Sequence, residues 1–189
     1  MSVRPGGELA TRPLHFIWIA DCSGSMAVDG KIQSLNTAIK EAIPHMRAVA
    51  DENLNAQVLV RAIKFSTGAE WHVSQPTEIS DFRWEDLSAD GVTDMGEALL
   101  MVADELHIPP MTDRALPPVL VLISDLFEGG IAEEMLSRVH QLLADGVTVV
   151  VLLALSDSGA PSYDHEHAAA LAALGVPAFA CTPDQFPDL

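Results

Sequence analysis

Hydrophobic residues gather in short, unbroken runs that predict buried strands. The runs at 14–20, 119–124 and 147–155 contain almost no polar residue, and a shorter one lies at 176–180. A strand with one face in solvent would alternate polar and apolar residues, so continuous runs of this length are typical of strands buried on both faces. These four segments are therefore predicted to form the interior of a sheet.

Between these runs, apolar residues recur every three or four positions, which predicts amphipathic helices. The first two stripes are Ile32, Leu35, Ile39, Ile43 and Met46, then Met95, Leu99, Val102 and Leu106, and further helices are predicted at 132–144 and 164–174. Pro44 is expected to end or kink the first helix, because proline lacks the backbone N–H group. Asp94, three residues before Glu97, predicts a capping box at the start of the second.

The order of the elements predicts the fold class. A β-rich segment at 56–66 is followed by another at 70–74, which we expect to pair with it in antiparallel fashion. Elsewhere strands alternate with helices, which indicates an α/β fold: a doubly wound, mainly parallel sheet with one antiparallel edge strand and helices on both faces. Residues 13–189 are predicted to form a single domain after a flexible N-terminal segment, 1–12, with a final helix that is short or truncated.

Composition excludes some classes of partner. The chain has 10 Lys and Arg residues against 27 Asp and Glu residues, for a net charge of −17, and nucleic acid binding needs a basic surface instead. We expect no membrane segment, because no apolar run is long enough to span a bilayer. The N-terminus lacks the apolar core of a signal peptide, and two cysteines do not form a disulfide framework, so a cytoplasmic location is predicted.

Polar residues with metal-binding chemistry follow two of the buried strands. Asp21 and Asp125 stand at the ends of the runs 14–20 and 119–124; Ser23, Ser25 and Thr93 lie in loops that are expected to reach the same edge. Two carboxylates and three hydroxyls are hard oxygen donors, which suit Mg²⁺, Mn²⁺ or Ca²⁺. Hydroxyl ligands are neutral, so a cation that they hold would still attract a carboxylate from a partner. Each residue could alternatively be an ordinary helix cap.

Together these residues resemble the metal-ion-dependent adhesion site of von Willebrand factor A (VWA) domains. The segment "DCSGS" matches the D-x-S-x-S signature, "DGVTDMGEAL" supplies Thr93, and "LVLISD" supplies Asp125. The resemblance covers residues 13–185 and implies the Rossmann-like VWA fold. It implies that Ser23 and Ser25 bind the metal directly, that Thr93 binds directly or through water, and that Asp21 and Asp125 act mainly through water or orient the hydroxyls.

The loops show one departure from the family pattern. Many relatives have glycine directly after the aspartate that corresponds to Asp125, whereas this chain has Leu126 and reaches glycine only at 129 and 130. The shape of this loop is therefore left open. Gly24 is expected to allow a tight turn, and Cys22 to point away from the metal.

The resemblance implies a non-catalytic, metal-dependent protein-interaction module. The chain most resembles stand-alone bacterial VWA proteins of tellurium resistance and stress response, whose partners include kinases and phosphatases. Other bacterial VWA domains work with MoxR-type AAA+ ATPases. The sequence does not choose between these two groups of partners. The alternative is a Mg²⁺-dependent phosphotransferase of the haloacid-dehalogenase type. That family needs a second acid where Ser23 stands, and a phosphate-binding lysine, which no suitable loop beside the site is expected to supply. The pair His165 and His167 is assigned to a solvated helix start, because residues two apart do not share a helix face.

Overall fold

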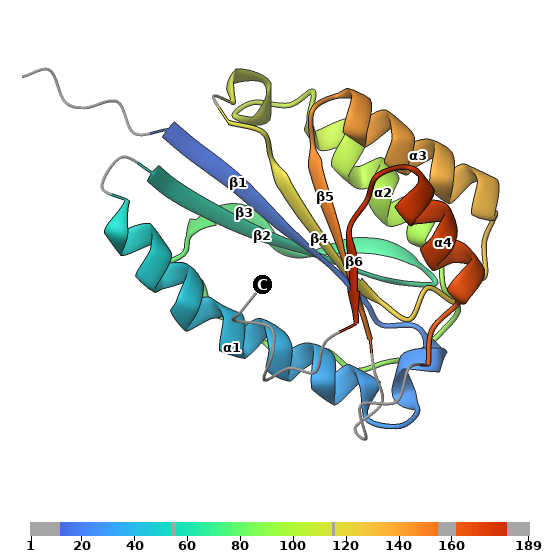
Figure 1. The fold of residues 1–189 in the computed structure, drawn as a ribbon. Helices are drawn as coiled ribbons and strands as arrows, with labels where there is room; N and C mark the ends of the chain where they lie inside the picture. Colours follow the sequence, from blue (N-terminus) through green and yellow to red (C-terminus); the bar gives the residue numbers. More distant parts are fainter. Residues whose placement is uncertain (1–11, 54–55, 115, 155–161, 181–189) are drawn as a thin grey trace, which may run out of the picture.

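The structure is a computed structural model, and it describes residues 12–53, 56–114, 116–154 and 162–180. Within these residues a six-stranded sheet has the order β3-β2-β1-β4-β5-β6. The strands are β1 (Arg12–Asp21), β2 (Ala56–Ser66), β3 (Gly68–Glu78), β4 (Val119–Ser124), β5 (Thr148–Leu153) and β6 (Ala178–Ala180). Figure 1 shows the twist of the sheet and the helices that flank it.

Strand pairing confirms the predicted fold class. β1 lies between β2 and β4 and is parallel to both, and β4, β5 and β6 continue in parallel. Only β3 runs antiparallel among the described strands, and it follows β2 after a tight turn at Thr67, as expected. The result is a mainly parallel sheet with one antiparallel edge strand.

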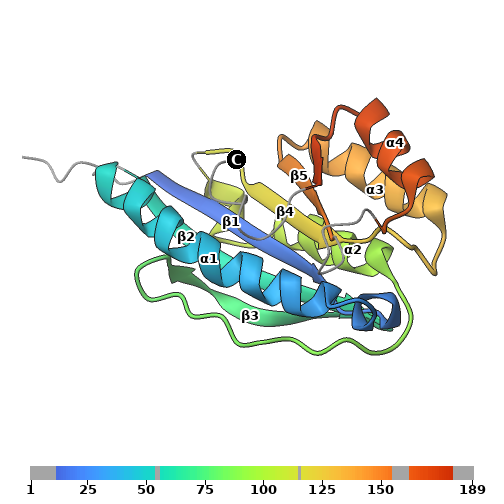
Figure 2. The ribbon, with the colours of Figure 1, turned by 60° about the horizontal axis from the view of Figure 1, so that its bottom comes forward.

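Helices cover both faces of the sheet. α1 (Lys31–Glu52) lies on one face, and α2 (Met95–Glu105), α3 (Ala132–Ala144) and α4 (His165–Ala173) lie on the other, as Figures 1 and 2 show from two directions. Two short 3₁₀ helices, η1 (Gly24–Ala27) and η2 (Met111–Asp113), complete the described elements. The apolar stripes predicted for α1 and α2 face the sheet, where their residues are buried or nearly so.

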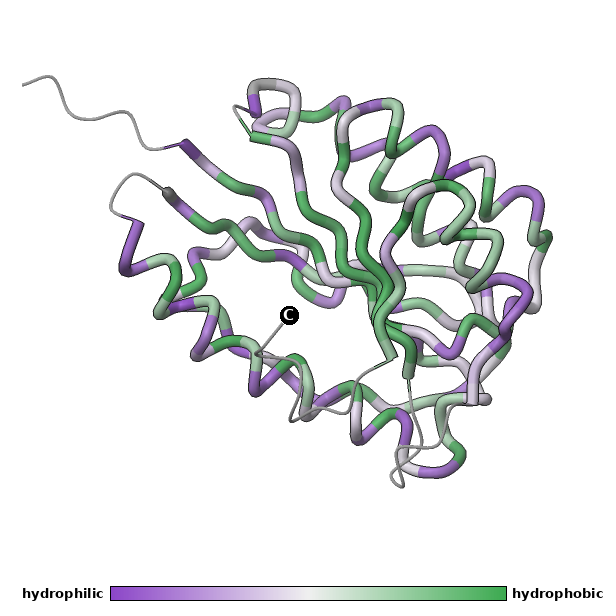
Figure 3. Tube along the Cα trace, in the orientation of Figure 1, coloured by the Kyte–Doolittle hydropathy of each residue, from purple (hydrophilic) through white to green (hydrophobic). Residues whose placement is uncertain are grey.

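The central strand is apolar on both faces because both faces are covered. Ile17 and Ile19 of β1 pack in the core beneath α2 and α3, whereas Trp18 and Ala20 pack in the core beneath α1. Figure 3 shows the same feature as continuous hydrophobic colour along the inner strands. Full burial of one such aliphatic side chain contributes about 1.5–3 kcal/mol, so these two cores hold the ends of β1 and β4 firmly in place.

Some predicted boundaries were wrong. Of the two effects expected of Pro44, an end or a kink of the helix, the end is excluded, because α1 continues to Glu52. Pro44 is exposed, so the carbonyl of Lys40 that lacks its usual N–H partner lies on the solvent side, where water can satisfy it. β5, α4 and β6 are each shorter than predicted.

The chain ends lie largely outside the described residues. β1 begins at Arg12, the last residue of the segment that was predicted to be flexible, and residues 1–11 are not described. The predicted final helix would fall in 181–189, which also lies outside the described part of the chain. None of the helices that the structure describes has both the length and the apolar character needed to cross a bilayer.

Candidate metal centre

The ends of β1 and β4 place two polar residues side by side. Ala20 of β1 is paired with Ile123 of β4, so Asp21 and Ser124 follow at the same edge of the sheet. Asp21 is fully buried and its carboxylate accepts two hydrogen bonds, from the Ser23 backbone N–H at 2.9 Å and from the Ser124 hydroxyl at 2.5 Å. Asp21 therefore fixes the loop after β1 and ties it to β4.

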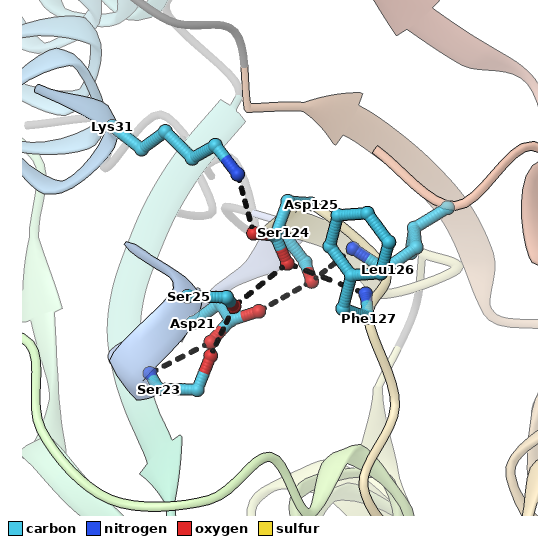
Figure 4. A network of polar contacts seen from close by, with 8 residues as sticks. All are labelled: Asp21, Ser23, Ser25, Lys31, Ser124, Asp125, Leu126 and Phe127. Carbon is cyan, nitrogen blue, oxygen red and sulfur yellow. Dashed lines mark hydrogen bonds and ion pairs between the residues drawn. The ribbon is translucent and has the colours of Figure 1, made fainter. Parts of the chain in front are cut away.

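Three oxygen-bearing side chains form a line across this edge. The hydroxyls of Ser23 and Ser25 are 3.1 Å apart, and the Ser25 hydroxyl donates to Asp125 Oδ1 at 3.2 Å. Figure 4 shows these groups pointing toward one another from the loop after β1 and from the end of β4. Residues 100 positions apart in the sequence thus meet in one network, as the C-terminal-edge argument predicted.

Asp125 also binds a lysine that the sequence argument did not place here. Its Oδ2 accepts a hydrogen bond from Lys31 Nζ at 2.8 Å, and the Lys31 side chain is only 4% exposed. The sequence offered no phosphate-binding lysine in a loop beside the site, and Lys31 belongs instead to the first turn of α1. Asp29 and Gly30 both have positive φ, 53° and 70°, and this turn starts α1 at Lys31 beside the loop.

Thr93 lies close to this site but is not a member of the network in Figure 4. It is buried in the loop that leads into α2, and its backbone carbonyl accepts from the Gly129 N–H at 3.2 Å. The Glu128 carboxylate joins the same two loops, because it accepts from Met95 N at 3.0 Å and from Gly130 N at 2.7 Å. The structure therefore brings four of the five predicted residues into one hydrogen-bonded set and attaches the Thr93 loop to it through the backbone.

Two glycines permit the loops to approach so closely. The Gly24 N–H donates to the Gly91 carbonyl at 3.0 Å, and a Cβ atom at Gly24 would lie only 3.0 Å from that same oxygen. A Cβ atom at Gly129 would lie 2.7 Å from Val92 Cγ1, in the loop that carries Thr93. Any side chain at these positions would push apart the loops that carry the candidate ligands.

Leu126 settles the shape of the loop after Asp125. Its φ of +60° lies in the left-handed region, which glycine adopts without strain. For a residue with a side chain this conformation costs about 1–2 kcal/mol. Its N–H donates to the Ser124 hydroxyl at 2.8 Å and its side chain is fully buried. Burial of that side chain offsets the strain, so the turn that suits glycine is retained with leucine.

The electrostatics of the site follow from its burial. Burial raises the pKa of Asp21 to about 6; the hydrogen bonds from Ser124 and Ser23 oppose this effect, and the charge of Asp125 adds to it. Burial raises the pKa of Cys22 to about 12, with a further contribution from Asp21. The Cys22 thiol packs in the α1-side core, with the Ala20 carbonyl as its hydrogen-bond acceptor. Cys22 is therefore a neutral core residue and not a nucleophile.

The oxygen spacing fits a small hard cation. Adjacent ligands of an octahedral ion with bonds of about 2.0–2.1 Å lie about 3 Å apart. The successive spacings in the line from Ser23 through Ser25 to Asp125 are 3.1 and 3.2 Å. Among the residues that the structure describes there is no cluster of three or more His, Cys, Asp or Glu side chains able to hold a metal. The oxygen donors that converge at this edge include the hydroxyls of Ser23 and Ser25.

The histidines at the start of α4 have a structural explanation. The Asp164 carboxylate caps the helix by accepting from the N–H groups of Glu166 and His167. His167 Nδ1 lies 2.9 Å from the Leu126 carbonyl, so the ring supports the loop after Asp125. This contact could not be read from the local pattern, because it joins residues 41 positions apart.

Several solved structures share this fold at low sequence identity. The structure resembles manganese-loaded TRAP protein from Plasmodium vivax, with a TM-score of 0.60 and 14% identity over 82% of this chain and 61% of that one. It also resembles the ArnB paralog VWA2 from Sulfolobus acidocaldarius, with a TM-score of 0.62 and 17% identity over 95% of this chain and 44% of that one. A third is proximal thread matrix protein 1 from the mussel byssus, with a zinc-occupied MIDAS motif, at a TM-score of 0.61 and 18% identity over 95% and 46% of the two chains.

The family is shown by its sequence model. The model of the VWA domain containing CoxE-like proteins matches residues 77–188, more than half of the chain, and the chain therefore belongs to this family. A curated relative, the uncharacterized protein YehP of Escherichia coli strain K12, is 34% identical over 75 residues, which is 40% of this chain and 20% of YehP. The match thus spans about a fifth of that relative's length.

Membership in this family defines the general role of the chain. VWA domains are protein-interaction modules and are generally non-catalytic. These similarities give no support to a phosphotransferase of the haloacid-dehalogenase type. Lys31 does stand beside Asp125, but the second acid of that type is replaced by Ser23.

Proposed function

We propose that this chain is a protein-interaction module whose binding depends on a divalent cation at the edge formed by β1 and β4. The observation that carries the proposal is the line of oxygens from Ser23, Ser25 and Asp125, with spacings suited to a hard octahedral ion. The proposed ion is Mg²⁺, with Mn²⁺ or Ca²⁺ as chemically similar occupants. It would supply a positive centre that a carboxylate of a partner can bind.

Each candidate residue has a distinct proposed role. Ser23 and Ser25 would bind the ion through their hydroxyls, and Asp125 Oδ1 faces the same point. Both oxygens of Asp21 already accept hydrogen bonds, which supports an orienting or water-mediated role. Thr93 would complete the site from the third loop, whose backbone is bonded to the loop after Asp125.

The surroundings of the site support protein binding. The loops that carry or adjoin the candidate ligands also carry four exposed apolar side chains: Val28 at 55%, Val92 at 60%, Phe127 at 44% and Ile131 at 64% exposure. We call these four residues the apolar rim. Apolar side chains around a polar centre are typical of surfaces that bind proteins.

The apolar rim indicates the chemistry of the partner. A segment with an Asp or Glu residue flanked by apolar side chains would place its carboxylate at the cation and its apolar groups against the rim. Within a cytoplasmic bacterial setting, kinase or phosphatase partners of a stress-response or tellurium-resistance system and MoxR-type AAA+ ATPases stay as proposed classes. The proposed role includes no catalysis by this chain.

An affinity capture experiment tests the proposal. Tagged wild-type protein is incubated with an array of peptides in which an acidic residue is flanked by apolar ones. The incubation is done in Mg²⁺ and in chelator at the same ionic strength, because salt screens charge interactions. We expect capture in Mg²⁺ that is lost in chelator and in Ser25→Ala. Val92→Ser should also weaken capture. Val49→Ser is the matched control, since Val49 is 60% exposed like Val92 but lies on α1 away from the site.

Two outcomes would contradict the proposal. Capture that is equal in Mg²⁺ and chelator would show that no cation is involved. Equal loss in Val92→Ser and Val49→Ser would show that the apolar rim is not the binding surface.

A further inference from the structure

Lys31 occupies a position that helix stability does not explain. It is the first residue of α1, where the helix macrodipole presents its positive end and favours acidic side chains. Its side chain is also almost completely buried, and buried lysine is uncommon because desolvation of the ammonium group is costly. A residue that opposes both effects needs a specific partner, and the partner here is Asp125.

Contacts hold the Lys31 ammonium group against the candidate metal site. Nζ lies 2.8 Å from Asp125 Oδ2 and 5.5 Å from the centre of the Phe127 ring. The other oxygen of Asp125, Oδ1, faces Ser25. Figure 4 shows Lys31 reaching Asp125 from a direction different from that of Ser23 and Ser25. The lysine and a cation could therefore share one carboxylate, each on its own oxygen.

The net charge of the site is more positive when Lys31 is included. Two ionised carboxylates, from Asp21 and Asp125, would balance a divalent ion and leave a neutral centre. With the ammonium of Lys31 the same loaded centre carries one net positive charge. The whole chain has a net charge of −17, so an acidic partner approaches against an unfavourable overall field, and a locally positive centre would favour its binding.

We propose that Lys31 is a built-in cation of the metal site: it pairs with Asp125 in the metal-free protein, and it weakens the affinity for the divalent ion while leaving the loaded site positively charged. This inference rests on the proposed function above. It also explains how a buried aspartate at the site is stabilised before any ion binds.

Direct titration with Mn²⁺, without any partner, tests this inference. Metal-free wild type, Lys31→Met and Lys40→Met are compared by calorimetry at neutral pH. Lys40→Met is the matched control, since Lys40 is also on α1 and also pairs with an aspartate, Asp86, but is half exposed. Removing a positive charge beside a bound cation is expected to tighten Mn²⁺ binding by about tenfold or more in Lys31→Met. Lys40→Met should match wild type.

Metal-free stability gives a second readout. Lys31→Met leaves Asp125 without its counter-ion, so its thermal midpoint in chelator should fall, and Mn²⁺ should raise that midpoint by more than it does in wild type. If Lys31→Met does not fold in chelator, Lys31→Gln keeps a hydrogen-bond donor to Asp125 without the charge and should show the same tighter binding.

The outcomes separate this inference from the proposed function. If Lys31→Met and Lys31→Gln bind Mn²⁺ as tightly as wild type or more weakly, while Ser25→Ala loses binding, the proposed role of Lys31 is wrong. The proposed metal site would not be affected by that result. An absence of Mn²⁺ binding in wild type and in both lysine variants would overturn both.

Discussion

Two buried ion pairs involve helices on opposite faces of the sheet, α1 for Lys31 and α2 for Glu105, and they have different surroundings. Lys31 and Asp125 meet at the C-terminal edge of β1 and β4, whereas Arg61 of β2 meets Glu105 of α2 at 2.5 Å. His15 lies near Arg61. It is on β1, six residues before Asp21, so the two residues are roughly 20 Å apart along the strand. One strand thus contributes to two buried polar clusters, one near each end.

What differs is the chemistry around the two pairs. The Arg61 guanidinium lies 4.7 Å from the Trp71 ring centre. Within the described part of the chain, its Nε and Nη2 atoms and both ring nitrogens of His15 have no hydrogen-bond partner. At Asp125, in contrast, the Ser25 hydroxyl bonds to the carboxylate and to the Ser23 hydroxyl, and the same or adjoining loops carry the exposed residues of the apolar rim. Buried charge alone therefore does not distinguish the two pairs; the hard oxygen donors that converge beside Asp125 do.

The largest expected effect is at the edge pair. In chelator, Asp125→Asn leaves the Lys31 ammonium buried without a carboxylate, so the free energy of unfolding should fall by about 3–5 kcal/mol. Urea denaturation followed by circular dichroism measures the change. Asp86→Asn is the control, because the exposed Lys40–Asp86 pair should contribute at most about 1 kcal/mol. Similar losses in both variants would remove the distinction between buried and exposed pairs.

A slightly smaller effect is expected at the interior pair. Glu105 is partly exposed, so Glu105→Gln should lower the free energy of unfolding by about 3 kcal/mol, the lower end for a broken buried pair. The same denaturation experiment is run with and without Mn²⁺. Because this pair lies away from the candidate metal centre, the loss should be the same in both conditions. A loss that depends on Mn²⁺ would show that the two clusters are coupled.

The smallest expected effect is the acid dependence of the interior cluster. Burial lowers the pKa of His15 below 6.5, and the positive charges of Arg61 and Arg114 lower it further. Below pH 6.5 the unfolded chain takes up a proton that the folded chain does not, so folding stability should fall, by at most about 1.4 kcal/mol per pH unit. His15→Leu should remove this part of the loss.

The measurement is the difference in unfolding free energy between wild type and His15→Leu at pH 7 and pH 5. We expect the difference to shift in favour of His15→Leu at the lower pH. A difference that stays constant, or shifts in favour of wild type, would contradict the account of His15.

The sequence predicted which loops meet at this edge better than it predicted the contacts made there. The proximity of Asp21, Ser23, Ser25 and Asp125 was predictable because these residues follow buried strands, and parallel strands end at the same edge. Ser124 was missed because its hydrogen bond to Asp21 requires β1 and β4 to be neighbours in the sheet. Local sequence patterns do not predict the order of strands in a sheet.

Lys31 was missed for a related reason. It directly precedes Ile32 and the apolar stripe of α1, so it has the appearance of an ordinary exposed helix residue. Its contact with Asp125 spans 94 positions and depends on the turn at Asp29 and Gly30. The fold class and most strand positions were predictable because long apolar runs can be satisfied only in a covered sheet; long-range side-chain pairs were not.

The central claim is that hydroxyl oxygens at the edge of β1 and β4 hold a divalent cation. Calorimetric titration of metal-free wild type with Mn²⁺, in parallel with Ser25→Ala and with Ser34→Ala as a control serine on α1, tests this most directly. We predict one ion per wild-type chain, unchanged binding in Ser34→Ala, and binding in Ser25→Ala that is weaker by about tenfold or more, as expected for loss of a direct ligand. Equal binding by wild type and Ser25→Ala, or no binding by wild type, would contradict the claim.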